Sequence, residues 1–393
     1  MNAFEKLAAS AQPFQTVREI NQQPSAWRRT LEVLRAQRKD IASFLAPELI
    51  LSGAGSSEYV GRSIEAALRR TLGRAVSTVP TTHFVTHAET VFFPDRDYLL
   101  VSFARSGNSP ESVATFRRVQ EQFPRVKQLV ITCNRDGELA RCAAKSPASL
   151  CILLPEETND ASLVMTSSFS SLALAGLSLG FLDSFEAFGA LVDAAAAGAE
   201  RVIREYGDAI RDCAELRFTR ACYLGSHALL GVMHEARLKM QEMTAGRIVS
   251  TFDSFLGLRH GPQVFVNDAC IVVAALSSGP AARRYELDLL RELRDKKQGM
   301  GTLVICGKSD GEVRAVAKTV IEIFPTQEPL PDDCRVLTDI VACQILATFT
   351  SISRGLSPDN PSPDGIITRV VQGVTIYPWQ GSTTIPAASS RMR

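Results

Sequence analysis

Two acidic residues and a lysine, Glu235, Lys239 and Glu242, lie in a stretch whose apolar residues have helical spacing. A carboxylate on a rigid helix can take up and return a proton when burial raises its pKa towards neutrality, and Glu242 lies on such an expected helix. Glu235 lies further back on the same expected helix and is expected to support rather than react. The residues alone favour a simpler interpretation, in which Glu242 lies on a solvated helix face or pairs with Lys239.

Hydroxyl-rich turns follow three expected strands in the first half of the chain. A phosphate needs several donors that converge without obstruction, which Ser and Thr hydroxyls and a tight glycine backbone provide. One such turn would mean little, because Ser is also the ordinary residue at a helix start, but three at the carboxyl ends of strands predict a phosphate site. The candidate ligands are Gly55, Ser56, Ser57, Arg105, Ser106, Gly107, Ser109, Thr166 and Ser167, with Lys239 as a further candidate.

Strands and helices must alternate to bring these turns together. The expected strands are 49–51, 98–103, 128–133, 149–154, 221–224, 270–276 and 301–306. Helical patterns between them are typical of βαβ units, so we expect an α/β fold of parallel sheets flanked by helices in three αβα layers. Matching turns at Gly55 and Gly225, and at Ser106 and Ser278, are about 170 residues apart, which indicates a duplicated domain.

The length of 393 residues also favours two domains, because single cores stop growing at about 250–300 residues. We expect a helical arm over 1–45, a first, phosphate-binding domain over 46–192, a linking helix over 193–215, a second domain over 216–378 and a tail over 379–393. The second domain's turn at 277–280 is poorer in hydroxyl groups than the turns of the first. The first domain is therefore expected to hold the phosphate.

Composition argues against several classes of protein. A net charge of +1 offers no basic field for nucleic acid or an anionic membrane. The nine cysteines form no C-x-x-C pair and several lie in apolar runs, so we expect buried thiols in a reducing, cytoplasmic compartment. The apolar runs are shorter than the ~20 residues of a membrane span, and the N-terminus shows no signal peptide.

The other histidines give weaker signals. His83 and His87, with Glu89, superficially suggest a metal ligand set, but the Val, Phe and Thr residues around them favour a strand or loop, and no H-E-x-x-H pattern is present. We therefore expect no metal and no cofactor. His227 and His234 are expected in a wall of the site or in the core.

Several motifs together resemble one family. The turns 55–57 and 106–109 resemble the phosphosugar-binding turns of sugar isomerase (SIS) domains. The stretches 235–242 and 258–262 are similar to the E-x-x-L-K-x-x-E and L-K-H-G-P motifs in the isomerase half of glucosamine-6-phosphate synthase. The stretches 156–160, 165–169, 357–361 and 368–373 resemble the tagatose-6-phosphate ketose/aldose isomerase-like subgroup. The resemblance covers 45–378 and implies two tandem, flavodoxin-like SIS domains with a sugar-phosphate substrate.

The resemblance also implies roles for two residues. Glu242 matches the glutamate that moves a proton between C1 and C2 of the sugar. His260 matches the histidine that opens the sugar ring, a task that suits an imidazole because it titrates near neutral pH. In this family that histidine reaches the active site of a neighbouring subunit, so a homodimer is implied.

Departures from the synthase indicate the direction of the reaction. The synthase begins with a cysteine nucleophile on a glutaminase domain, whereas position 2 here is Asn and about 45 residues precede the first strand. The synthase's C-terminal lysine is missing from the tail. We therefore expect conversion of D-galactosamine 6-phosphate to tagatose 6-phosphate and ammonia. Three alternatives stay open: isomerisation of tagatose 6-phosphate without loss of nitrogen, deamination of glucosamine 6-phosphate, and a non-catalytic sugar-phosphate sensor.

Overall fold

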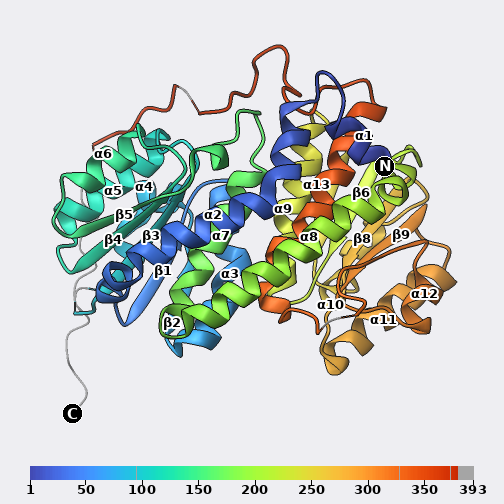
Figure 1. The fold of residues 1–393 in the computed structure, drawn as a ribbon, viewed down its shortest axis with the longest axis horizontal. Coiled ribbons are helices and arrows are strands. Elements are labelled where there is room, and N and C mark those ends of the chain that lie inside the picture. Colours follow the sequence, from blue (N-terminus) through green and yellow to red (C-terminus); the bar gives the residue numbers. More distant parts are fainter. Residues whose placement is uncertain (94, 327, 372, 379–393) are drawn as a thin grey trace.

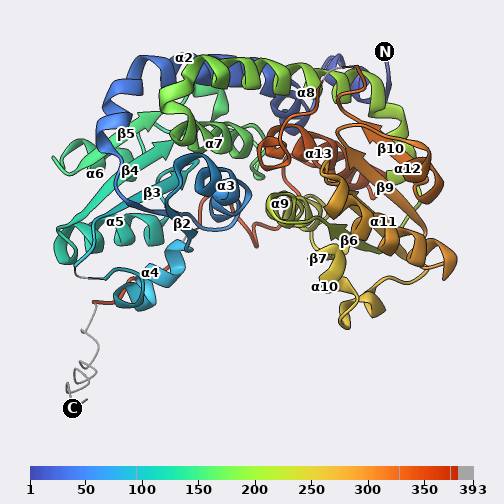
Figure 2. The ribbon, with the colours of Figure 1, turned by 90° about the horizontal axis from the view of Figure 1, so that it is seen from below.

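Two parallel five-stranded sheets lie at opposite ends of the molecule, with a layer of helices between them (Figures 1 and 2). The computed structural model describes residues 1–93, 95–326, 328–371 and 373–378. The strand orders are β2-β1-β3-β4-β5 and β10-β9-β8-β6-β7, which are the same order read from opposite ends. This repeated topology confirms the expected α/β fold with helices on both sides of each sheet.

The strands of each sheet all run in the same direction, so their carboxyl ends lie at one edge. The first sheet contains β2 (Ala75–Thr78), β1 (Glu48–Ser52), β3 (Tyr98–Ala104), β4 (Val126–Thr132) and β5 (Ser149–Leu153). The second contains β10 (Thr319–Glu322), β9 (Gly301–Cys306), β8 (Cys270–Ala275), β6 (Arg220–Leu224) and β7 (Val249–Asp253).

Three strands, β2, β7 and β10, were not expected from the sequence. All three lie at sheet edges and have only four or five residues. Several of their residues are exposed or half-buried. They therefore lack the continuous apolar run that marks a strand covered on both faces.

Thirteen α-helices occur in the described residues. They are α1 (Ala3–Ala8), α2 (Gln15–Phe44), α3 (Ser56–Leu72), α4 (Thr81–His87), α5 (Pro110–Gln122), α6 (Glu138–Ala144), α7 (Ser167–Leu177), α8 (Phe185–Ala214), α9 (Ala228–Met243), α10 (Phe255–Leu258), α11 (Pro280–Asp295), α12 (Gly311–Val316) and α13 (Val336–Ser353). Helices α2 and α8 run side by side along one face of the molecule (Figure 2). The expected arm is mostly α2, and the expected linking helix, 193–215, lies in α8 except for its last residue. The domain boundaries given above stay predictions.

The expectation of a strand or loop around His83 and His87 was wrong, because both lie on helix α4. Phe84 and Ala88, four residues apart, are both buried in one apolar cluster. Spacing of this kind suits a helix, since residues four apart share a helix face. The β-branched residues around the histidines pointed to a strand, and this packing outweighed their preference.

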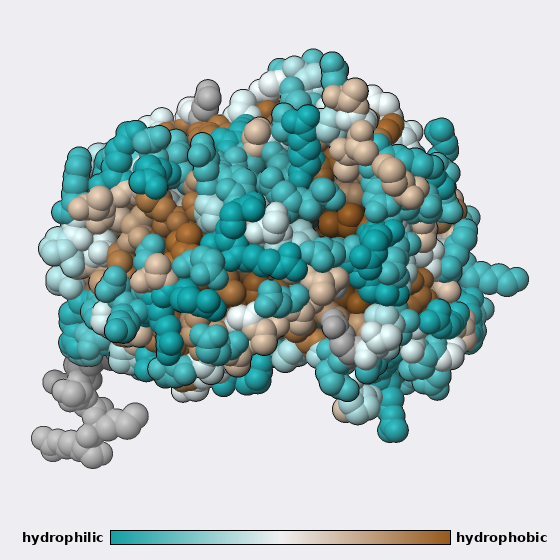
Figure 3. All heavy atoms as spheres, in the orientation of Figure 1, coloured by the Kyte–Doolittle hydropathy of each residue, from teal (hydrophilic) through white to brown (hydrophobic). Residues whose placement is uncertain are grey.

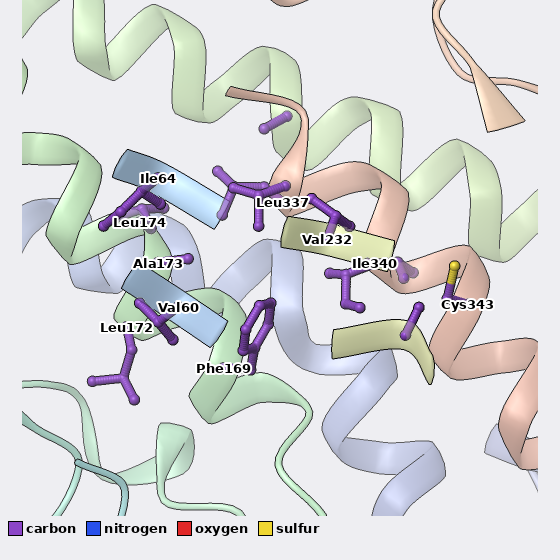
Figure 4. Close-up of a cluster of buried hydrophobic side chains, with 14 of the residues drawn as sticks. Val60, Ile64, Phe169, Leu172, Ala173, Leu174, Val232, Leu337, Ile340 and Cys343 are labelled. Carbon is purple, nitrogen blue, oxygen red and sulfur yellow. The ribbon is translucent and has the colours of Figure 1, made fainter. Parts of the chain in front are cut away.

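The core between the sheets is built from α3, α7, α9 and α13. Figure 4 shows Ile64 of α3 close to Leu174 of α7, and Val232 of α9 close to Ile340 of α13. Helices α3 and α9 pack against each other, and a Cβ at Gly231 of α9 would lie only 2.6 Å from a backbone oxygen of α3. Because glycine has no side chain, the two helices can approach this closely.

Two segments, 167–214 and α13, are long and apolar enough by length and composition to cross a membrane. In the structure 89% of the α13 window is buried among other elements, as a core helix requires. The face of the molecule shown in Figure 3 is mainly hydrophilic, with small apolar patches between the polar side chains. The nine cysteines are free and are buried or half-buried, as expected.

Candidate active site

Helix α9 carries a cluster of three charged side chains on one face. Lys239 Nζ lies 3.3 Å from Glu235 Oε1 and donates a hydrogen bond to Glu242 Oε2. The side chains of Glu235 and Lys239 are fully buried, whereas that of Glu242 is 24% exposed. Within this cluster, therefore, only the carboxylate of Glu242 is open to a molecule that arrives from solvent.

The cluster is joined to the first sheet by a serine. Lys239 Nζ donates to Ser56 Oγ at 2.9 Å, and Ser56 is the first residue of α3. The turn before it needs glycine twice. Gly55 has φ +58°, and a Cβ on Gly53 would lie 2.3 Å from the backbone of Ser57. This tight turn, together with the close crossing of α3 and α9, places Ser56 against Lys239.

Burial and charge set the protonation of the cluster. Burial raises the pKa of Glu235 from 4.5 to about 7, while the neighbouring Lys239 opposes the rise. Burial alone would lower the pKa of Lys239, but the two carboxylates raise it above its ordinary value. Lys239 is therefore a cation at neutral pH, and Glu235 can hold a proton there.

A small cavity of about 120 Å³ lies at the carboxyl end of the first sheet. Five of the residues expected to bind phosphate line it: Ser57, Arg105, Ser106, Gly107 and Ser109. The other expected ligands, Gly55, Ser56, Thr166, Ser167 and Lys239, do not line this cavity. The cavity lies between the turns that follow β1 and β3, and it holds hydroxyls and a cation together, as an anion site requires.

Arg105 is nearly fully buried beneath this cavity, with 7% of its surface exposed. Its Nη1 donates to the backbone oxygens of Ser162, Leu163 and Val164, and its Nη2 donates to that of Arg369. In the described chain no carboxylate forms an ion pair with Arg105. Burial, and then the like charge of Arg369, lowers its pKa. Ser57 lines the cavity and the preceding Ser56 accepts the hydrogen bond from Lys239, so the cavity and the α9 cluster meet at the start of α3.

Thr166 and Ser167 are fully buried and do not line the cavity, contrary to the expectation from sequence. Asp160 Oδ2 accepts hydrogen bonds from the N–H groups of Thr166 and Ser168, both at 2.8 Å, and from the Ser168 hydroxyl at 2.5 Å. The positive end of helix α7 is thus already neutralised by a carboxylate of the chain itself. The neighbouring Met165, rather than Thr166 or Ser167, lines the cavity.

A segment near the C-terminus completes the site, and sequence reasoning had not assigned it. Arg369, Val370 and Val371 line the phosphate cavity. Residues 361–364, 366 and 367 line a second cavity, of about 540 Å³, together with Glu242. The sequence did contain a signal for this segment, because 357–361 and 368–373 resemble motifs of the family. The motifs alone, however, assigned no chemical role to these residues.

Comparison with known proteins identifies the family. No family model matches the chain. D-galactosamine-6-phosphate deaminase AgaS of Escherichia coli is 36% identical over 382 residues, which cover 95% of this chain and 98% of that protein. The protein of the same name from a Shewanella species is 37% identical over 377 residues, covering 93% and 92%. This chain belongs to the AgaS family.

The solved structures agree with this assignment. The crystal structure of tagatose-6-phosphate ketose/aldose isomerase from E. coli matches this AgaS-family chain with a TM-score of 0.85 and 34% identity, over 95% of this chain and 99% of that one. The expected family is therefore confirmed.

His260 lies elsewhere in this AgaS-family chain. It is exposed, just beyond the short helix α10 of the second half of the chain. Across the described ranges, no hydrogen bond or ion pair joins it to Glu242. The apolar side chains of Leu256 and Val264, on either side of it, are 47% and 84% exposed. The tail in which the synthase's C-terminal lysine is missing, 379–393, lies outside the described residues.

The remaining histidines have other surroundings. His83 Nε2 lies 3.0 Å from Thr90 Oγ1, and the rings of His83 and His87 are 5.8 Å apart. His234 is half-buried and stacked between the rings of Tyr59 and Phe252, each 3.8 Å away. Burial lowers its pKa to about 4. His227 is exposed at the turn after β6 rather than in the core.

The equivalent turn of the second sheet has its donors already occupied. The N–H and hydroxyl groups of Ser277 donate to Glu286, and the N–H of Ser278 donates to Asp332 at 2.8 Å. Carboxylates of the AgaS-family chain therefore fill the place that an anion would take. This favours the first sheet as the phosphate-binding half.

Proposed function

We propose that this enzyme converts D-galactosamine 6-phosphate and water to tagatose 6-phosphate and ammonia. The AgaS proteins of E. coli and Shewanella carry the name of that deaminase, and the alignments cover nearly the whole chain. The observation that carries the proposal is the position of Glu242. It is the exposed carboxylate of a buried ionic cluster, bound through Lys239 to the turn at Ser56.

The proposed chemistry needs one carboxylate that moves a proton. Glu242 removes the proton from C2 of the open-chain amino sugar while O1 takes up a proton from solvent, which leaves an enolamine. Glu242 then returns its proton to C1, and loss of an N–H proton to solvent leaves a C2 imine. Water then adds to the imine carbon, and ammonia leaves. Lys239 holds the Glu242 side chain in place through their direct ion pair. The turns at Ser57 and Ser106 hold the phosphate at the other end of the substrate.

The proposal is tested by measuring ammonia release from D-galactosamine 6-phosphate with a coupled assay. E242Q keeps the shape of the side chain and removes the base, so we expect turnover to fall by ~10²-fold or more. E200Q is the matched control, because Glu200 is an exposed carboxylate on α8 that pairs with Arg28. Wild-type protein that releases no ammonia from any hexosamine 6-phosphate would falsify the proposal.

A second candidate is isomerisation of tagatose 6-phosphate without loss of nitrogen. The related E. coli crystal structure bears the name of that isomerase. Both reactions would use Glu242 in the same way, so E242Q does not separate them. Parallel assays with galactosamine 6-phosphate, glucosamine 6-phosphate and tagatose 6-phosphate do, and they also test the sugar's configuration at C4. A sensor would bind a sugar phosphate with zero turnover, and E242Q would leave that binding unchanged.

We also propose a cytoplasmic homodimer, with no nucleic acid or membrane partner, in which His260 serves the site of the partner subunit. His260 is exposed between two exposed apolar side chains, a surface suited to contact with another copy. Mixing inactive E242Q and H260N chains tests this. A hybrid dimer would contain one intact site, so an equal mixture should recover about a quarter of the wild-type activity. No recovery, with exchange of subunits verified, would refute the shared site.

A further inference from the structure

Two arginines from distant parts of the sequence meet at the small cavity of the first sheet. Arg105 follows strand β3, and Arg369 lies in the segment near the C-terminus; both line the cavity beside Ser57 and Ser106. The backbone oxygen of Arg369 accepts a hydrogen bond from Arg105 Nη2 at 2.8 Å. The two residues are therefore in direct contact.

Both guanidinium groups are held by neutral oxygen atoms. Arg369 Nε and Nη2 donate to the backbone oxygen of Asp160 at 2.8 and 2.6 Å, and Nη2 also donates to Asn159 Oδ1 at 2.6 Å. Arg105 donates only to backbone oxygens. Over 1–93, 95–326, 328–371 and 373–378, neither arginine forms an ion pair with a carboxylate. Two like charges thus lie close together around a partly buried cavity, and the carboxylates whose charge acts on Arg105 without pairing with it are Asp160 and Glu242. An anion that enters the cavity would offset the remaining repulsion between the arginines.

We infer that Arg369 is a phosphate-binding residue that acts with Arg105 to select the dianionic form of a phosphate monoester. This inference rests on the proposed function in so far as the ligand is a sugar phosphate. A phosphate monoester has its second pKa near ~6, so it carries close to two negative charges at neutral pH. Two guanidinium groups match that charge, and their planar N–H groups match the geometry of phosphate oxygens.

The same contact links the two ends of the substrate. Arg369 belongs to the segment whose residues 361–364, 366 and 367 line the cavity beside Glu242. A phosphate bound by Arg369 therefore holds this segment as the wall of the cavity in which the sugar carbons react. Loss of the charge at 369 should weaken phosphate binding first, and should raise KM more than it lowers kcat.

The test is calorimetric titration of the full-length protein with inorganic phosphate at pH 7.5 and pH 5. R369Q removes the charge but keeps N–H donors, R369K keeps the charge, and R125Q is the control. Arg125 is an exposed arginine of the same half of the chain that pairs with Asp97. At pH 7.5 we expect R369Q to raise the Kd for phosphate roughly 10- to 100-fold, and R369K and R125Q only a few-fold at most. The gain in affinity from pH 5 to 7.5 should shrink in R369Q alone.

Two results would overturn the inference. One is R369Q binding phosphate as tightly as wild type. The other is R369Q and R369K weakened equally, which would mean that Arg369 only holds the Asp160 backbone. If R369Q does not fold, R369K at the two pH values decides, because loss of the preference for the dianion in R369K contradicts a role for charge. The phosphate titration does not depend on turnover, so it can be read even if the protein releases no ammonia. Failure of the proposed function can therefore be distinguished from failure of this inference.

Discussion

Replacement of Glu235 by Gln keeps the size of a fully buried side chain and removes its titration. The pKa of Glu235 is raised from 4.5 to about 7, chiefly by burial. The difference of about 2.5 pH units means that ionising this carboxyl costs about 3 kcal/mol more in the folded protein than in the unfolded chain.

The direction of the effect follows from the raised pKa. The folded protein binds a proton at Glu235 more tightly than the unfolded chain does. Wild-type protein therefore loses stability as pH rises from 4.5, and the loss is complete once pH has passed about 7. E235Q does not titrate here, because Gln resembles the protonated acid. The free energy of unfolding of E235Q minus that of wild type should rise by about 3 kcal/mol between pH 4.5 and pH 8.

The assay is urea unfolding at pH 5, 6, 7 and 8, followed by tryptophan fluorescence, since Trp27 is fully buried. E200Q, which removes an exposed carboxylate, should differ from wild type by the same small amount at every pH. A difference between E235Q and wild type that stays flat, or falls, as pH rises would show that Glu235 titrates normally in the fold. The reasoning from burial would then be refuted.

Three further substitutions test other contacts. K239M leaves two carboxylates beside each other without their shared cation, so the free energy of unfolding in urea at pH 8 should fall by about 3 kcal/mol. The fall should be smaller at pH 5, and equal falls at the two pH values would contradict this. D359N weakens the acceptor that caps the first turn of α2, so the free energy of unfolding should fall by about 1 kcal/mol, and an unchanged Tm would argue against the cap. The pKa of His234 is lowered from 6.5 to about 4, so wild-type protein loses stability as pH falls through that range. H234F keeps the stack between Tyr59 and Phe252 and should lose less in acid; an unchanged acid-unfolding midpoint would contradict this.

The sequence was informative where chemistry is local. The turn after β1, the turn after β3 and the helix with Glu235, Lys239 and Glu242 each carry their functional groups within ten residues or fewer. Strand patterns were equally clear for the central strands, which are covered on both faces. Edge strands carry half-exposed residues, so their pattern is too weak to detect.

Contacts between distant segments could not be read from the sequence. The serine-rich turn at Thr166 had the composition of a phosphate site, but Asp160 already accepts from the backbone N–H groups of Thr166 and Ser168. Arg369 was part of a recognised motif, yet only the fold places it beside Arg105, 264 residues earlier. In both cases the deciding group comes from a loop whose path local propensity does not determine.

The duplication gives the two halves of the chain different tasks. In the second half, Glu286 and Asp332 occupy the donors of the turn at Ser277. In the first half, the corresponding edge of the sheet keeps a cavity with a buried arginine. Helix α9 of the second half instead supplies the charged groups, and Gly231 lets it approach α3 closely enough for Lys239 to reach Ser56. Since neither half holds both the proposed anion site and the proposed catalytic carboxylate, the proposed reaction would require the two halves to be packed as they are here.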